Sequence, residues 1–189
     1  MRAAKHCWPL LGALLLLAAS GCSKPPPPHD TIQEYMEGVI NPAGDFLFRS
    51  VEDVSDAKGT RLKAPSTDAE WKEVSERLAV MHAAPDVLTA QGVKVAPPGF
   101  KAEHPPIESE PAWIQQALDN NRADFNRRAF RLRTAADKGM DAVALRDPRA
   151  LERALDGIDK ACESCHLHYF YPNDKRAWQA AKEDGMVDP

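Results

Sequence analysis

The chain lacks two features that would point to common classes of partner. It has no excess of positive charge, since 24 Lys and Arg stand against 28 Asp and Glu, a formal net charge of −4. Nucleic-acid binding needs a basic face, so nucleic acid is not an expected partner. The chain also lacks the roughly 20 apolar residues that a transmembrane helix needs, because its apolar run from Leu10 to Ala19 is much shorter.

That short run has the flanks of an export signal. Arg2 and Lys5 precede it, and Ser20 and Gly21 lead into Cys22. This pattern predicts a secretory signal over residues 1–21. The segment AASGC that ends at Cys22 resembles the lipobox of bacterial lipoproteins, with Ala19 where that family prefers Leu.

The lipobox resemblance implies a lipid on Cys22 and a protein tethered to the membrane surface on the periplasmic side. Ser23, which is not acidic, favours the outer membrane under the usual sorting pattern. Residues 22–29, with Pro25 to Pro28, would then form a stiff extended spacer. The alternative is cleavage by the ordinary signal peptidase, which leaves Cys22 unmodified.

Cysteine is scarce in the remainder of the chain. Cys7 leaves with the signal and Cys22 is assigned to the lipid, so only Cys162 and Cys165 remain for the folded domain. A structural zinc site needs four ligands, and the sequence offers no second pair of ligands at matching spacing. Two interpretations of the remaining pair stay open, a redox dithiol and a haem attachment site.

No stretch alternates with period two, whereas four stretches have a helical period. The first starts at Asp30 or Thr31 and reaches Val54, with a kink near Asn41 caused by Pro42. The other three are predicted from their start and stop signals. They run from Thr67, in capping-box spacing with Glu70, to Gly92; from Pro111 to Gly139; and from Asp147–Pro148 through the cysteines.

Residues 92–110 contain several prolines and are expected to be irregular. The four helical periods predict an all-α fold. Short turns between the first two and the last two helices, with a longer link in the middle, favour antiparallel packing of the four helices. We expect an antiparallel four-helix bundle over residues 30–176, with the two cysteines on its C-terminal helix, and a C-terminal tail over residues 177–189. No internal repeat is visible.

The last helix places its two thiols on the apolar face, on the stripe Leu151, Leu155, Ile158, Cys162, Cys165. His166 lies four residues after Cys162, so it shares that face. The pattern Cys-x-x-Cys-His is the attachment signature of c-type haem. A redox dithiol normally begins a helix, where the helix N-terminus lowers a thiol pKa, so the late position of this pair favours haem.

The chain resembles the class II cytochromes c, the group that contains cytochrome c′. The resemblance covers about residues 30–176 and is carried by YMEGVINPAGDFLF, GTRLKAPSTDAEW and CESCHLHYFYP, of which only the last is strongly specific. It implies thioether bonds from Cys162 and Cys165 to haem c and an axial iron ligand from His166. Many members have a basic residue after the aromatic at Tyr169, where this chain has Phe170; Lys175 or Arg176 would then supply the charge.

The resemblance also implies a sixth iron ligand from the first helix, where Met36 lies on the apolar stripe. A gap-filling core role is the alternative for this residue. Met81 and His82, on the second helix, are weaker candidates. We also expect aromatic residues to line the haem, namely Tyr35, Phe46, Phe125 and Tyr169.

Together these features predict an electron carrier tethered to a membrane, with a redox protein of unknown identity as partner. The alternative is a five-coordinate haem module for gas binding or redox sensing, with Ile32, Met36 and Ile40 as distal walls. An enzyme is not expected, because no distal Arg and His pair for peroxidase chemistry is evident. Related bundles often pair, so a homodimer is a further expectation.

Overall fold

The computed structural model describes residues 30–57 and 59–186. Within them the chain is mostly helical, as predicted. The predicted signal, Cys22 and the proline-rich spacer lie outside the described residues. The helices, in chain order, are α1 (Ile32–Tyr35), the π-helical segment η1 (Met36–Ile40), α2 (Asn41–Ser50), α3 (Asp68–Leu88), α4 (Pro111–Asn120), α5 (Arg122–Leu145), α6 (Pro148–Tyr169) and α7 (Lys175–Glu183).

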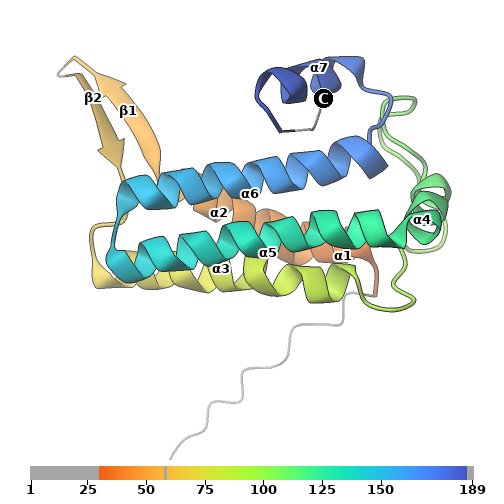
Figure 1. The fold of residues 1–189 in the computed structure, drawn as a ribbon, viewed down its shortest axis with the longest axis horizontal. Helices are drawn as coiled ribbons and strands as arrows, with labels where there is room; N and C mark the ends of the chain where they lie inside the picture. The colour runs from red at the N-terminus through yellow and green to blue at the C-terminus, as the bar shows by residue number, and fades with distance from the viewer. Residues whose placement is uncertain (1–29, 58, 187–189) are drawn as a thin grey trace, which may run out of the picture.

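The long helices α3, α5 and α6 lie side by side, with α1 and α2 behind them (Figure 1). Helix α4 lies at one end of this group, and α7 lies over α6 near the same end. Residues 177–183, expected to be part of a tail, therefore belong to a helix. Its Ala181 is buried and packs in one small cluster with Leu167 of α6.

The starts of two long helices follow the sequence signals. The Thr67 hydroxyl accepts from the Glu70 amide at 3.2 Å, and the Glu70 carboxylate accepts from the Thr67 amide at 2.9 Å, which confirms the predicted capping box. The Asp147 carboxylate accepts from the amides of Arg149 and Ala150, both at 3.0 Å. Pro148 is then the first residue of α6, as predicted.

Pro42 changes the helical register without breaking the helix. The Asn41 amide donates to the Met36 carbonyl, five residues back, and both Ile40 and Asn41 keep helical dihedral angles. Because Pro42 has no amide hydrogen, it cannot donate to the carbonyl four residues before it. The expected kink is thus a π-helical turn that joins α1 to α2.

The first helix ends earlier than predicted. It stops at Ser50, and an antiparallel hairpin follows, with β1 (Glu52–Asp56) paired to β2 (Gly59–Lys63). The prediction of helix to Val54 was wrong because each five-residue strand has only one partly buried apolar position, Val54 in β1 and Leu62 in β2. Such strands are too short and too exposed to give a period-two pattern.

The predicted helix from Pro111 to Gly139 is two helices, divided at Asn121, and the second continues past Gly139 to Leu145. Gly139 does not end the helix; it lets α5 approach α3. A Cβ atom at this position would lie 2.7 Å from Leu78 Cδ2. The helix ends instead at Leu145, and the next residue, Arg146, has a left-handed conformation with φ of 50°.

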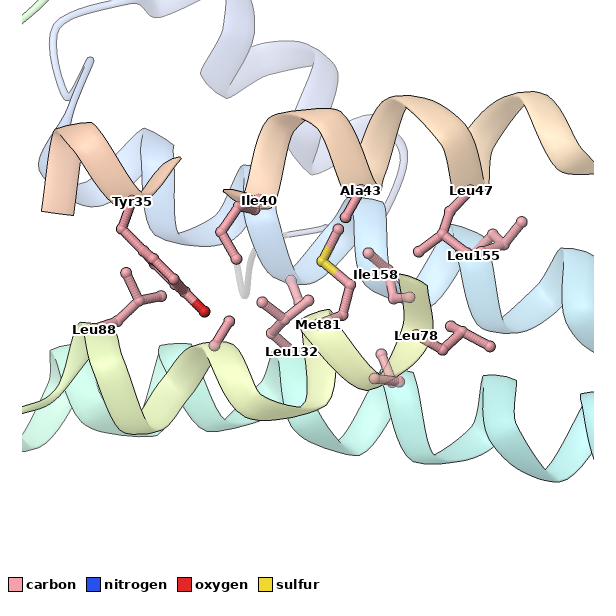
Figure 2. Packing of buried hydrophobic residues seen from close by; sticks show 14 of the residues in the cluster. Tyr35, Ile40, Ala43, Leu47, Leu78, Met81, Leu88, Leu132, Leu155 and Ile158 are labelled. Carbon is pink, nitrogen blue, oxygen red and sulfur yellow. The ribbon is translucent and has the colours of Figure 1, made fainter. Parts of the chain in front are cut away.

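The core lies between the N-terminal helices and α3, α5 and α6. Figure 2 shows Ala43 and Leu47 of α2 facing Leu78 and Met81 of α3, with Ile158 of α6 beside them. Met81 is 1% exposed, and its side chain points towards α2 in this view. The apolar stripes of the sequence thus form one continuous core.

Candidate functional site

A cavity of about 370 Å³ opens between the N-terminal helices and α6, with α3 and α5 as its other walls. Its size falls within the range of about 300–1,000 Å³ found for pockets that bind small molecules and cofactors. Residues from four parts of the chain line it, namely Met36, Ile40, Asn41, Gly44, Asp45, Phe48, Met81, Leu88, Arg128, Ala129, Leu132, Ile158, Asp159, Ala161, Cys162, Glu163, Cys165 and His166.

Helix α6 brings the attachment signature to this cavity. Leu151, Leu155 and Ile158 anchor the helix in the core. The same stripe continues into Cys162 and Cys165, which are partly buried and pack against that core. Both thiols are free, and both line the cavity with His166. The structure therefore brings together the three residues that the sequence singled out for haem.

The electrostatic surroundings of the thiols do not suit a redox dithiol. Burial raises the pKa of Cys162 to about 12, and the carboxylates of Asp159 and Glu163 add to the effect. Burial likewise raises the pKa of Cys165 to about 12. Reactive dithiols need a lowered thiol pKa. Burial also lowers the pKa of His166, which favours the neutral imidazole that binds metal ions.

The N-terminal helices form the facing wall. Met36, Ile40, Gly44 and Phe48 recur every four residues and all line the cavity, whereas the neighbouring stripe, which includes Ala43 and Leu47, enters the core. Sequence reasoning followed the core stripe and missed Phe48. On a regular α-helix Phe48, twelve residues after Met36, would lie on another face, and the π-helical turn changes the phase so that both line the cavity.

Besides the two thiols, two methionine thioether sulfurs lie at the cavity. Met36 is partly buried on the N-terminal wall, and Met81 is packed inside the core at the cavity's edge. A Cβ atom on Gly44 would lie 3.4 Å from Met81 Cε, so Met81 is held closely by α2. Of the expected distal walls, Met36 and Ile40 line the cavity and Ile32 does not.

The four aromatic residues expected to line the haem lie outside the cavity lining. Phe46 is turned to another side of α2, where the Arg77 guanidinium lies 5.4 Å from its ring centre. Phe125 and Tyr169 pack edge to face, with ring centres 5.3 Å apart. Tyr35 is buried in the core near Leu88 (Figure 2).

A partly buried ion-pair network borders the cavity on the side of α5. Arg128 Nε lies 2.8 Å from Asp124 Oδ2, and Arg128 Nη1 donates to Ser164 Oγ at 2.8 Å. The Tyr169 hydroxyl donates to Asp124 at 3.0 Å. Burial alone would raise the pKa of Asp124, but hydrogen bonds from Arg128 and Tyr169 and the charges of Arg128 and Arg127 lower it. The expected cations, Lys175 and Arg176, are exposed on α7 and do not line the cavity.

A second, smaller cavity of about 180 Å³ lies on another side of His166. Its lining includes Val95 and Phe100 from the irregular segment, Ile114 of α4, and Phe170. The His166 ring packs against Phe170, with ring centres 5.3 Å apart. The imidazole thus forms part of the wall between two hollows.

The donor set fits a metal that brings its own ligands. Among residues 30–57 and 59–186, no group of three or more His, Cys, Asp and Glu side chains could hold a metal ion. A porphyrin supplies four nitrogen ligands and needs from the protein only one or two axial ligands. His166 and a methionine meet that need, and the two free thiols lie beside them.

Comparison with known proteins adds no relative: no protein-family model, curated protein or solved structure matches the chain. In the described part of the chain, no helix is both long enough and apolar enough to span a bilayer.

Proposed function

We propose that the chain is a c-type cytochrome that carries single electrons through a covalently bound haem. Cys162 and Cys165 would form the thioether bonds, and His166 would be the axial iron ligand. The observation that carries the proposal is that all three line one cavity, opposite a wall that contains Met36. A haem c supplies a one-electron Fe(III)/Fe(II) couple when bound.

In this proposal the arrangement of α2, α3, α5 and α6 is that of an antiparallel four-helix bundle, as in the class II cytochromes c. Helix α6 sets the spacing of the two thiols and His166, and the core residues hold α6 against the other helices. The apolar lining from Ile40, Leu88 and Leu132 would exclude water from the iron. Lipid on Cys22 would hold the protein at the periplasmic side of a membrane, where it would meet its redox partner.

Expression with and without c-type haem maturation machinery tests this proposal. The mature protein should gain the mass of one haem, retain it after denaturation, and show reversible changes in its absorption spectrum on reduction. A double variant, Cys162→Ala/Cys165→Ala, should lose the covalent attachment, whereas Ser164→Ala, a substitution between the two cysteines, should keep it. A wild-type protein with the mass of bare polypeptide under maturation conditions would contradict the proposal.

A second candidate function is a five-coordinate haem module for gas binding or redox sensing. The observation that favours it is the apolar lining beside Met36, which Ile40 and Leu88 contribute. Met81 is packed into the core, so if Met36 also stayed in the wall, a small gas could occupy the sixth position. Carbon monoxide binding distinguishes the electron carrier from the five-coordinate module. Rapid, tight binding to the reduced wild-type protein at neutral pH would support the five-coordinate module and exclude methionine ligation.

A further inference from the structure

Arg128 differs in charge from the other ionisable side chains that surround the thiols. In the described part of the chain, it is the one Lys or Arg that lines the cavity, and it shares that lining with the acidic side chains of Asp45, Asp159 and Glu163. An arginine stays protonated under all ordinary conditions. The cavity therefore has a permanent positive charge on the α5 side.

This charge has a fixed position. The Arg128 side chain is 13% exposed, and Asp124 and Ser164 hold its Nε and Nη1 atoms. Ser164 lies between the two cysteines, so the guanidinium is bonded to the turn of α6 that carries both thiols.

Asp124 does not cancel the positive charge of this cluster. It is a single carboxylate that pairs with both Arg127 and Arg128, so the three side chains together have a net positive charge. Arg127 is 61% exposed and does not line the cavity. Solvent screens the exposed Arg127 strongly, so it contributes little inside the cavity. Arg128 lines the cavity and its partner Asp124 does not, so the cation of this pair is the nearer charge to a group bound there.

We propose that Arg128 raises the reduction potential of the haem attached to Cys162, Cys165 and His166. This inference rests on the proposed function. Reduction adds one electron to the iron centre, so a nearby cation stabilises the reduced form relative to the oxidised form. Asp45, Asp159 and Glu163 act in the opposite direction, and Arg128 offsets them.

Redox titration of the haem-loaded full chain tests this role. At a fixed applied potential near the wild-type midpoint, Arg128→Gln should raise the ratio of oxidised to reduced haem about tenfold, which corresponds to about 59 mV for a one-electron couple. Arg127→Gln is the matched control. It removes a positive charge that also pairs with Asp124, and it leaves the cavity lining unchanged. It should alter the ratio by less than about twofold.

Arg128→Lys distinguishes the effect of the positive charge from that of the hydrogen bonds. It also provides a second test of the proposal if Arg128→Gln fails to fold. It keeps the positive charge but loses the forked contact with Asp124 and Ser164, so its potential should stay close to that of the wild type. Equal shifts in Arg128→Gln and Arg127→Gln, or a full tenfold change in Arg128→Lys, would overturn the role of Arg128. A wild-type chain that takes up no haem would instead overturn the proposed function, so the two failures are distinguishable.

Discussion

Met36 and His166 line the same cavity from two helices at opposite ends of the chain. Met36 begins the π-helical segment η1, and His166 lies in the last turns of α6. A thioether and an imidazole on either side of one iron would give a six-coordinate, low-spin haem with a raised potential. The site thus offers the two axial ligands that the proposed electron carrier would need.

Replacement of Met36 by Ala should open the sixth coordination position. We expect the reduced Met36→Ala protein to bind carbon monoxide rapidly, whereas the wild type resists it, because the iron would lose its thioether. Absorption spectra recorded with and without carbon monoxide measure this change.

Met81→Ala is the matched control, since it removes the other sulfur at the cavity. Met81 is 1% exposed, so its truncation should lower the free energy of unfolding by about 2–5 kcal/mol without admitting carbon monoxide. If Met81→Ala opens the iron and Met36→Ala does not, Met81 is the ligand and the assignment of Met36 is wrong.

Pro42 should control the orientation of Met36. Pro42→Ala restores an amide that can donate to the carbonyl of Gly38, four residues earlier, and so favours an α-helical register in place of the π-helical turn. Removal of the extra residue from the turn would rotate α1 and the start of η1 relative to α2. We expect a larger fraction of the reduced variant to bind carbon monoxide.

Pro111→Ala provides the comparison for that experiment. Pro111 is the first residue of α4, where the missing amide hydrogen has no helical partner to lose. This variant should bind no more carbon monoxide than the wild type. Equal behaviour of the two proline variants would show that the π-helical turn does not position Met36.

Gly139 should be necessary for the packing of α5 on α3. An Ala side chain at this position would lie 2.7 Å from Leu78 Cδ2, so Gly139→Ala should destabilise the protein by about 1–3 kcal/mol through overpacking. Gly157 of α6 is the matched control, because its added Cβ would lie 3.5 Å from Ala135 Cβ, an ordinary contact. There the gain in helix propensity should stabilise the protein by about 0.5–1 kcal/mol.

Urea unfolding of both glycine variants measures the difference. Opposite signs of the change in unfolding free energy are the expected result. If Gly139→Ala left the unfolding free energy unchanged, Leu78 would have adopted another rotamer at little cost. The close approach of α5 and α3 would then not depend on glycine.

Local signals predicted the parts of the fold that depend on neighbouring residues. Thr67 with Glu70, and Asp147 with Pro148, cap their helices through contacts within three residues, so the sequence alone identifies both helix starts. Gly139 misled the prediction because a glycine can end a helix or allow close packing. Only the distant Leu78 side chain decides between these roles.

The same distinction applies to the candidate site. Cys162, Cys165 and His166 share one helix, so their spacing was enough to group them. Phe48 depended on the phase of the first helix, which the π-helical turn alters. Arg128 depended on how α5 packs against α6, and the sequence gives no local signal for that contact.

The capping box of α3 should make stability depend on acidic pH. Hydrogen bonds from the Ser66 and Thr67 amides, and then from their hydroxyls, lower the pKa of Glu70 from 4.5 to about 2. A carboxyl with a lowered folded-state pKa stabilises the fold fully above its unfolded pKa and loses that effect as the pH falls through the folded value. Stability should therefore decline from about pH 4.5 towards pH 2.

Glu70→Gln isolates this contribution, because glutamine can accept the same amide hydrogen bonds but does not titrate. The urea midpoint of the variant should fall less steeply between pH 4.5 and pH 2 than that of the wild type. Thr67→Ala removes the hydroxyl acceptor at Glu70 N and one of the donors to the Glu70 carboxylate, while both amide donors remain, so it should lower the midpoint across the whole pH range and reduce the acid dependence only in part. Parallel pH profiles for Glu70→Gln and the wild type would show that the Glu70 carboxylate is not the titrating group, because the amide contacts to residue 70 are the same in both proteins.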